Sequence, residues 1–586
     1  MTPQRYPPTT AHQLEGGWRF GWVDLVVLLA IFALLWALVV LGGDMRVQFD
    51  ELHPTHLSLE VWMIPYYTAR TVLRMLIAFG ASLLFTFAWG YAAAKNRRAR
   101  RIMIPVIDIL QSVPVLGFLS VTVTGFLALF PGSLLGVECA AIFAIFTAQA
   151  WNMTFGFYHS LVTIPAEMRE AARVYRLNPW RRFTLVELPA ASIGLIWNSM
   201  MSFGGGWFFV AQSEAISVLN KNIKLPGLGS YMAAAVEAGD TRAAMYAIAA
   251  MIVTIVAFDQ LVWRPLIAWA EKFKMEQTEG GEAPQSWFLE FLRRSYALDW
   301  LSEHVGGAFG RAARRIADAG SDLAQGLRRR APSRVREALR ALVWVAGAAL
   351  VAGLFVDALG IARQIRTELT PEEMLRVVGL GFLTLLRVVV MTAIATALWT
   401  PIGVWIGLRP PVARIAQPLA QIAASFPVNM TFPFVVGLFI AWHVPIGVGS
   451  VFLMALGTQW YILFNVIAGA MAIPTDLREA ARLFGMGGWR LWKTLVIPAI
   501  FPFWVTGAVT AAGGAWNASI VAEVATWGKE RLVADGLGAY IAQVTERGDT
   551  PAIYFSIFVM SVFVVVINRA LWRRLYDLAE SKFRLG

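Results

Sequence analysis

The chain has 586 residues, of which 58% are hydrophobic and 15% are charged, and its mean hydropathy is +0.59. These values exclude an ordinary soluble protein and predict a protein that crosses a lipid bilayer many times. The formal net charge of +12 does not indicate nucleic-acid binding, because the basic residues gather in short loops between hydrophobic segments. The single cysteine, Cys139, excludes a disulfide framework, and no His/Cys cluster has the spacing of metal ligands.

The first half of the chain contains six hydrophobic segments. Each is long enough to cross a hydrocarbon core about 30 Å thick. The residues before the first segment lack the features of a cleaved signal peptide, so we expect that segment to remain as a membrane helix. The segments lie near residues 25–43, 71–93, 105–130, 139–162, 188–210 and 243–268, within a first half of residues 1–269.

A polar connector, residues 270–340, separates these segments from six more. Its middle, residues 287–301, has apolar residues at helical spacing beside arginines, which fits a helix on the membrane surface or against a partner. A partly ordered tether is an equally good interpretation. The later segments lie near 341–360, 379–408, 418–441, 446–470, 497–522 and 552–572, within a second half of residues 341–586.

The loops between the segments predict the orientation of the chain. Lysine and arginine gather in residues 95–101 and in the two loops 164–190 and 473–499. Loops rich in these residues stay in the cytoplasm. Residues 131–138 and 443–447, which fall on the opposite side, contain neither lysine nor arginine. Twelve spans with both termini in the cytoplasm satisfy every loop, so the predicted fold class is an all-α polytopic membrane protein.

The two halves repeat each other. A constant separation of 309 residues relates Glu170 to Glu479, Pro189 to Pro498, Glu214 to Glu523 and Tyr231 to Tyr540. Upstream, a separation of 313 residues relates Arg74 to Arg387 and Pro114 to Pro427. We call residues related in this way equivalent. Because both halves have the same number of spans and begin on the same side, they form two parallel six-helix repeats about an axis along the membrane normal.

The loops 164–190 and 473–499 each predict a short helix that begins with proline and carries acidic residues toward its positive end. Alanines leave a surface that another protein can approach closely. A surface helix whose arginines only orient the chain is the alternative, but it does not explain the same residues at the same place in both halves. The candidate contact residues are Glu170, Ala171, Ala172 and Arg173 in the first loop, and Glu479, Ala480, Ala481 and Gly485 in the second.

These loops resemble the cytoplasmic loop signature of ABC importer permeases: E-A-A, three residues, G, nine residues, an apolar residue, one residue and L-P. The second copy matches through Gly485 and Pro498, although Ile497 precedes this proline, whereas the first has Arg176 in place of the glycine. Segments such as 71–83 and 515–527 are similar to the nitrate, sulfonate, taurine and bicarbonate permease class. The resemblance implies a fused, duplicated type I permease of the bacterial inner membrane whose short helices are coupling helices.

The resemblance also implies the partners of the chain. Two ATP-binding subunits are expected to bind the coupling helices and to hold ATP and Mg, while a periplasmic substrate-binding protein delivers the solute. The chain itself has no G-x-x-x-x-G-K-[ST] motif, so we expect a transport permease that is not an enzyme and binds no cofactor or metal. A secondary transporter, which also often has parallel six-span repeats, is the main alternative. A scaffold or sensor is a third.

Candidate pathway residues are polar groups within the spans. Arg74 and Arg387 need a partner, water or the interface. Snorkelling to the nearby interface, or pairing with Glu214 and Glu523, is favoured over binding a passing anion. Glycines in residues 202–209 and 511–517 fit either close helix packing or a local break that exposes N–H groups to an anion. Polar candidates for the lining are Gln111, Ser112, Gln149, Asn152, Asn198, Ser425, Asn429, Thr431, Gln459 and Asn517.

The expected substrate is a small anion such as nitrate, bicarbonate or a sulfonate. This expectation comes from the resemblance, from the equivalent arginines and from the mid-span glycines. An amino acid, a cation or an uncharged solute remains the alternative, because the binding protein of such an importer often determines selectivity.

Overall fold

The structure is a computed structural model that describes residues 21–45, 57–218, 221–273, 286–301, 303–304, 333–527 and 530–582. Nearly all regular structure in these ranges is helical. The main helices of the first half are α1 (Trp22–Asp44), α2 (Ile64–Phe85), α3 (Tyr91–Lys95), α4 (Arg97–Ser112), α5 (Val115–Leu129), α6 (Leu134–Val162), α7 (Ala166–Val174), α8 (Pro179–Arg182), α9 (Leu188–Glu214), α10 (Leu228–Glu237), α11 (Thr241–Phe258) and α12 (Arg264–Ala270).

The second half repeats this order after two connector helices, α13 (Trp287–Arg293) and α14 (Tyr296–Leu301). Its helices are α16 (Ser333–Glu368), α17 (Pro371–Gly407), α18 (Pro410–Ser425), α19 (Phe432–Ala441), α20 (Ile446–Met471), α21 (Thr475–Leu483), α22 (Gly488–Leu491), α23 (Ile497–Ala522), α24 (Leu537–Arg547), α25 (Thr550–Ile567) and α26 (Arg573–Lys582).

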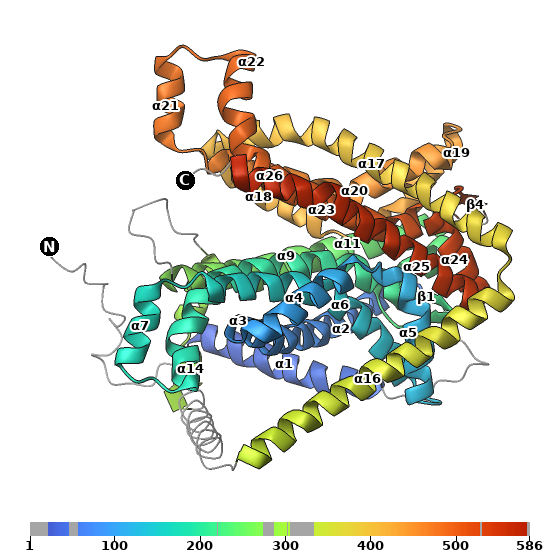
Figure 1. Ribbon diagram of the computed structural model, residues 1–586, viewed down its shortest axis with the longest axis horizontal. Coiled ribbons are helices and arrows are strands. Elements are labelled where there is room, and N and C mark those ends of the chain that lie inside the picture. The colour runs from blue at the N-terminus through green and yellow to red at the C-terminus, as the bar shows by residue number, and fades with distance from the viewer. Residues whose placement is uncertain are drawn as a thin grey trace.

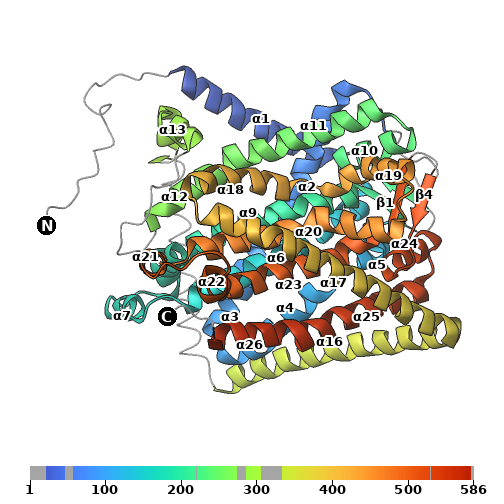
Figure 2. The ribbon, with the colours of Figure 1, turned by 90° about the horizontal axis from the view of Figure 1, so that it is seen from above.

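The long helices run side by side along the longest axis of the molecule (Figures 1 and 2). Helices α7 and α21 project from one end, and two short hairpins lie at the other. Because the basic loops contain α7 and α21, the positive-inside tendency places that end in the cytoplasm. We call it the loop end, and the opposite end the hairpin end.

Among the described residues, seven helices are long and apolar enough to cross a membrane, or up to nine if each of two bent pairs is one span. This confirms an all-α polytopic membrane protein. The remaining predicted spans, near 25–43, 188–210 and 341–360, coincide with α1, α9 and α16. Helix α9 carries serines, glycines, an asparagine and a glutamine, which make it less apolar than the helices that pass this test.

Two of the predicted spans are bent pairs of helices. Residues 105–130 form α4 and α5, which meet at 88°, and residues 418–441 form α18 and the helical stretch ending with α19, which meet at 75°. The bends fall at equivalent prolines, Pro114 and Pro427. The residue before each proline is extended, with ψ of 124° at Val113 and 130° at Phe426. A residue before proline avoids the helical region, so the chain turns at the same place in both halves.

Two β-hairpins occupy regions that the sequence analysis treated as loops. Strand β1 (Ala215–Val218) pairs antiparallel with β2 (Lys221–Lys224), and β3 (Val524–Trp527) pairs with β4 (Glu530–Val533). In both hairpins the first strand follows directly after a long helix, α9 or α23. The hairpins therefore close the hairpin end at equivalent positions in the two halves.

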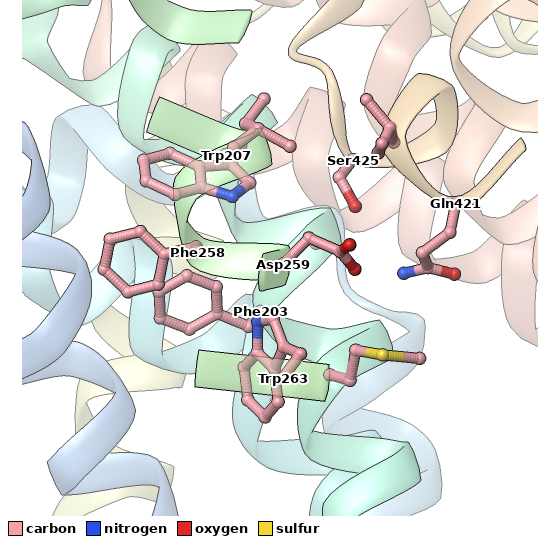
Figure 3. A pocket seen from close by; sticks show the side chains of 11 residues that line it. Phe203, Trp207, Phe258, Asp259, Trp263, Gln421 and Ser425 are labelled. Atoms are coloured by element: carbon pink, nitrogen blue, oxygen red, sulfur yellow. The ribbon is translucent and has the colours of Figure 1, made fainter. Parts of the chain in front are cut away.

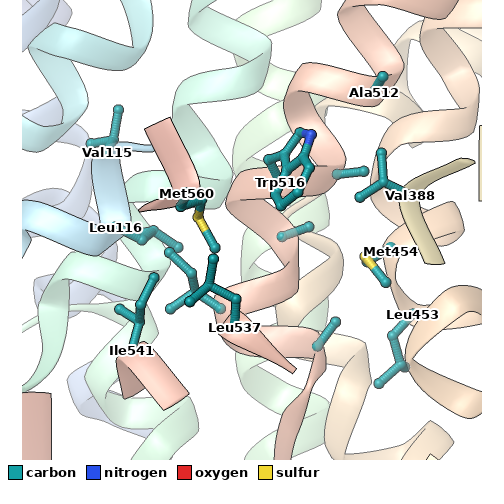
Figure 4. Packing of buried hydrophobic residues seen from close by; sticks show 14 of the residues in the cluster. Val115, Leu116, Val388, Leu453, Met454, Ala512, Trp516, Leu537, Ile541 and Met560 are labelled. Atoms are coloured by element: carbon teal, nitrogen blue, oxygen red, sulfur yellow. The ribbon is translucent and has the colours of Figure 1, made fainter. Parts of the chain in front are cut away.

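The largest apolar cluster joins the halves. Val115 and Leu116 on α5 belong to the same buried cluster as Leu537, Ile541 and Met560 of the second half (Figure 4). Trp516 lies in the middle of this cluster and is 2% exposed. Because burial of apolar surface is the main stabilising term, the first half packs into the second through the helix that follows its bend.

The connector is docked where it is described. The carboxylate of Asp24, which is 2% exposed, accepts hydrogen bonds from the Ser295 hydroxyl at 2.9 Å and the Ala297 N–H at 2.7 Å. The rings of Trp22 and Phe291 lie 5.8 Å apart. Residues 286–301 therefore pack against α1, so the tether interpretation is wrong for this stretch. Residues 274–285 and most of the stretch from 302 to 332 lie outside the described residues.

Candidate functional site

A cavity of about 390 Å³ lies between the two halves at the hairpin end. It is bounded by the last turn of α9, the last turn of α23 and both hairpins. Its lining residues are Leu116, Leu119, Ala211, Gln212, Ala215, Gly229, Met232, Ala233, Val236, Glu237, Asn429, Met430, Phe432, Pro433, Ile520, Val521, Val524, Ala525, Thr526, Arg531, Ala542, Thr545 and Glu546.

Most of the lining residues form equivalent pairs. The pairs 309 residues apart are Ala211 with Ile520, Gln212 with Val521, Ala215 with Val524, Ala233 with Ala542, Val236 with Thr545, and Glu237 with Glu546; those 313 apart are Leu116 with Asn429 and Leu119 with Phe432. A cavity whose walls come from equivalent positions lies on the axis that relates the repeats. Such an interface is where membrane transporters built from repeats place their substrate path.

The cavity wall is mainly apolar, with a few polar groups. Asn429 Nδ2 donates a hydrogen bond to Gln212 Oε1 at 3.2 Å, so one amide pair joins the two halves across the axis. Arg531 and Glu546 form an ion pair at 2.9 Å, and Glu237 pairs with Lys224 at 2.5 Å. Within the described residues no group of three or more His, Cys, Asp or Glu side chains could hold a metal ion. The site therefore offers room for a small solute among apolar walls.

Arg74 is held by two carboxylates beside this cavity. The guanidinium is 0% exposed and bonds Glu214 Oε1 through Nη1 at 2.7 Å. Its Nε and Nη2 donate to Glu138 at 2.5 and 2.7 Å. Arg70, also 0% exposed, bonds Glu138 at 2.5 Å. The predicted pairing of Arg74 with Glu214 is confirmed, and its hydrogen-bond donors are directed at groups of the protein.

The second half has a simpler version of this group of arginines and glutamates. Arg387 bonds Glu523 at 2.8 Å, as predicted, and its Nε donates to the Gly447 carbonyl oxygen at 3.1 Å. Gly447 is equivalent to Glu138, and Leu383 stands where the first half has Arg70. Sequence reasoning missed Arg70 and placed Glu138 in a loop, whereas α6 already begins at Leu134. The signal that could have found them was an arginine one turn before Arg74 and an acid beside an apolar run.

These glutamates also hold the helices that line the cavity. Glu214 accepts hydrogen bonds from the Thr71 hydroxyl at 2.7 Å and the Gly229 N–H at 2.7 Å, at the start of α10. Glu523 accepts from the Thr384 hydroxyl at 2.9 Å and the Ala539 N–H at 3.1 Å, at the start of α24. Each buried carboxylate thus fixes one wall of the cavity to the span that carries the arginine.

The other polar candidates are scattered. Of them, Asn429 lines the cavity. Asn198 donates to the Gly194 carbonyl oxygen, Asn152 to Ser202, Gln111 to Asp108 and Thr431 to the Val428 carbonyl oxygen, while Gln459 accepts from Trp399 and Asn517 from the Val115 N–H. Gln149 is 0% exposed and its Oε1 is 3.5 Å from the Ser82 hydroxyl. The side chain of Ser112 lies outside the described part of the chain. Most of these groups are thus engaged within or between helices.

Ser425 lies at a second contact between the halves. It borders a small space of about 20 Å³ with Gln421 of α18 on one side and Asp259, Phe203, Trp207 and Trp263 of the first half on the other (Figure 3). A Cβ added at Gly204 would lie 2.7 Å from Ser425 Oγ. Helices α9 and α23 are continuous through the glycine stretches, so the alternative interpretation of a local break is wrong. At Gly204 the absence of a side chain serves close packing.

The two loops form the predicted short helices, α7 and α21, at the loop end (Figure 1). Gly485 has φ of +63°, and Arg176, its equivalent, has φ of +49°. Both therefore turn the chain through the left-handed region, where a residue with a side chain is strained. Ala172 and Ala481 are only 3% and 2% exposed and face the loop interior, so the expectation of an exposed alanine surface is wrong for these two, whereas Ala171 is exposed and Ala480 is half-buried.

Large apolar side chains are exposed on these loops instead. Val174 and Tyr175 are 79% and 77% exposed, and the equivalent Leu483 and Phe484 are 87% and 79% exposed. An apolar pair on a charged loop at the same place in both halves is typical of a contact surface for another protein. Sequence reasoning named the acidic and alanine positions and missed these apolar pairs.

Comparison with known proteins relates part of the chain to named permeases. A protein of Methanocaldococcus jannaschii that carries the name of an ABC transporter permease is 30% identical over 138 residues, which are 24% of this chain and 50% of that protein. A bicarbonate transport system permease protein of Synechococcus elongatus is 26% identical over 194 residues, 32% of this chain and 64% of that protein. A nitrate import permease protein of Leptolyngbya laminosa is 24% identical over 185 residues, 32% of this chain and 63% of that protein. Each match thus spans less than two thirds of the relative.

The family comparison covers both halves. The model of the family described as binding-protein-dependent transport system inner membrane component matches residues 86–262 and again residues 399–584. The two matches include both loops, both bends and both long helices that end at the cavity. Together they cover more than half of the chain. The chain therefore belongs to this family of ABC importer permeases, with two copies of the family unit in one polypeptide.

Proposed function

We propose that the chain is the transmembrane permease subunit of an ATP-driven importer and that its substrate path begins at the cavity on the axis between the halves. The observation that carries this proposal is the pairing of equivalent residues around the cavity, such as Val236 with Thr545. Two projecting loops at the opposite end supply contacts for two ATP-binding subunits. Closure of the two ATP-binding subunits against each other would move α9 and α23 relative to each other. This movement would open the path alternately to the two sides of the membrane.

The proposed contact surface includes Glu170, Ala171, Arg173, Glu479, Ala480 and the turn residue Gly485, together with the exposed apolar pairs. Ala172 and Ala481 would support this surface from inside the loops. ATP and Mg would bind to the partner subunits, and a periplasmic binding protein would bind at the hairpin end. This arrangement needs one copy of the chain for each pair of ATPases.

Reconstitution tests this function. The chain, its ATP-binding subunits and its binding protein should together take up solute into liposomes only when ATP is supplied to the loop side. A secondary transporter would instead take up solute with the chain alone, driven by an ion gradient. Uptake without ATPase subunits would contradict the proposal, and ATP hydrolysis that never moves a solute would favour a scaffold or sensor.

We further infer that the solute is a small anion of the bicarbonate or nitrate kind. The names of the bicarbonate and nitrate relatives support this class. Ionic groups at the cavity are mainly paired with each other, so selectivity would rest on the binding protein and on the amide pair of Gln212 and Asn429. Thermal shift of the cognate binding protein against panels of anions, cations and neutral solutes is the direct test. Stabilisation by cations or sugars alone would remove the anion from the proposal and leave the importer in place.

A further inference from the structure

A buried glutamate near the loop end connects three segments of the first half. Glu187 is 3% exposed, and its Oε1 accepts a hydrogen bond from Lys95 and forms an ion pair with Arg182. Lys95 is the last residue of α3, and Arg182 is the last residue of α8 in the loop 164–190; its Nε lies 2.9 Å from Glu187 Oε1. Glu187 itself ends a π-helical turn, Phe183–Glu187, immediately before α9. We call these three residues the Glu187 cluster.

The second half has no charge at any of the three equivalent positions. Leu408 replaces Lys95, Leu491 replaces Arg182, and Val496 replaces Glu187. These three side chains take part in the large apolar cluster, where Val496 is 2% exposed. The same backbone architecture is therefore stable without ions. Since a buried ion pair is often no more stabilising than apolar residues of similar volume, stability alone does not account for the charges in the first half.

The position of the cluster suggests what the charges do. Lys95 lies at the turn between α3 and α4, and α4 leads through the bend to α5, whose Leu116 lines the cavity. Glu187 lies at the start of α9, a continuous helix that reaches Gln212 in the cavity. Arg182 belongs to the part of the loop 164–190 that returns from α7 to α9. The cluster thus ties the loop to both elements through which the first half reaches the cavity.

We propose that Glu187 is a positioning residue that makes α4 and α9 move together with the loop 164–190. The inference rests on the proposed function, in which this loop contacts an ATP-binding subunit. The hydrogen bond from Lys95 is charge-assisted and directional, and the ion pair with Arg182 adds a second attraction to the same oxygen, so together they hold the loop, α3 and α9 in one arrangement. The apolar contact of the second half allows its segments to slide. The first half therefore follows its loop more rigidly than the second half does.

Replacement of Glu187 by glutamine tests the proposal. In the reconstituted complex, the E187Q variant should hydrolyse ATP at the wild-type rate while solute uptake per ATP falls by about tenfold, the effect expected for loss of a charge-assisted hydrogen bond together with an ion pair. If E187Q does not fold, K95Q serves as the second variant, because Arg182 still pairs with the carboxylate and the loop surface is unchanged. It should lower uptake per ATP by about threefold. Arg98, an exposed cation in the same turn, supplies the matched control R98Q, which should couple normally.

A spectroscopic measurement separates this proposal from the proposed function. With Cys139 replaced by serine, spin labels at positions 97 and 166 report the distance between the start of α4 and the start of α7, and labels at 410 and 475 report the equivalent distance. E187Q should broaden the first distribution and leave the second unchanged, with no ATPase present. Unchanged uptake per ATP in a folded variant, or an unchanged first distribution, would overturn the positioning role. Failure of the wild-type complex to transport would instead remove the proposed function.

Discussion

Replacing Glu138 with glutamine is expected to destabilise the chain strongly. Glu138 is 0% exposed and accepts three hydrogen bonds, at 2.5, 2.5 and 2.7 Å, from two guanidinium groups that are also 0% exposed. Glutamine removes the negative charge and directs an NH₂ group toward cations. Arg74 keeps Glu214, but Arg70 keeps only the Leu41 carbonyl oxygen at 3.0 Å and Asp44 at 4.0 Å. Leaving a buried charge without its partner costs about 3–5 kcal/mol.

The free energy of unfolding is measured by denaturation in mixed micelles, followed by tryptophan fluorescence. E138Q should lose about 3–5 kcal/mol. The double variant R70L/E138Q should lose less, by at least about 1 kcal/mol, because it removes the uncompensated cation and places leucine where the second half has Leu383. The control E290Q, at an exposed position of α13, should stay within about 0.5 kcal/mol of the wild type.

Two results would refute this reasoning. An E138Q variant within 1 kcal/mol of the wild type, taking ~1 kcal/mol as the size of an ordinary neutral hydrogen bond, would mean that the charge of Glu138 is not needed to hold the arginines. A double variant less stable than E138Q would mean that Arg70 stabilises the fold without its carboxylate partner.

Three further predictions concern the complex. Charge reversal at Glu479 should impair ATPase coupling by a different amount from charge reversal at Glu170. The reason is that the turn after Glu479 contains Gly485, whereas the turn after Glu170 contains the strained Arg176. Equal losses of coupling would indicate that the two loops make identical contacts. Native mass measurement should find one copy of the chain with two ATP-binding subunits and one binding protein, and two copies would contradict this. The G204V variant should lose stability or transport, because its Cβ would lie 2.7 Å from Ser425 Oγ. The equivalent variant G513V should be tolerated, because no atom lies within 4 Å of the added Cβ. Similar effects of the two variants would show that the contact with Ser425 is not the cause of the loss.

Much of the architecture follows from the sequence because the repeat is visible in it. The constant separation of 309 residues relates Glu214 to Glu523 and Pro189 to Pro498. The structure places the two prolines in the first turn of α9 and α23, and the two glutamates at the carboxyl ends of these helices. Charge in the loops and apolar periodicity identify which segments are helical. The pairing of Arg74 with Glu214 follows because an arginine within a span needs a partner.

Other features depend on three-dimensional proximity that hydropathy does not contain. The apolar run from 105 to 130 continues across Pro114, so average hydropathy did not reveal the 88° bend. Glu138 was assigned to a loop because the apolar run behind it is long enough to span without it. The hairpins are only four residues per strand, too short for a periodic signal. The cavity required the packed halves, since Gln212 and Asn429 are 217 residues apart.

The amide pair between Gln212 and Asn429 has a consequence for the evolution of the proposed substrate path. In a permease assembled from two identical chains, every substitution appears on both sides of the axis, so a favourable change on one wall is always accompanied by its copy on the other. Here Val521 and Leu116 occupy the positions opposite the amides. Joining the halves in one polypeptide frees each wall to vary independently. The path can thereby become polar on one side and remain apolar on the other, a shape suited to a solute that itself lacks two-fold symmetry.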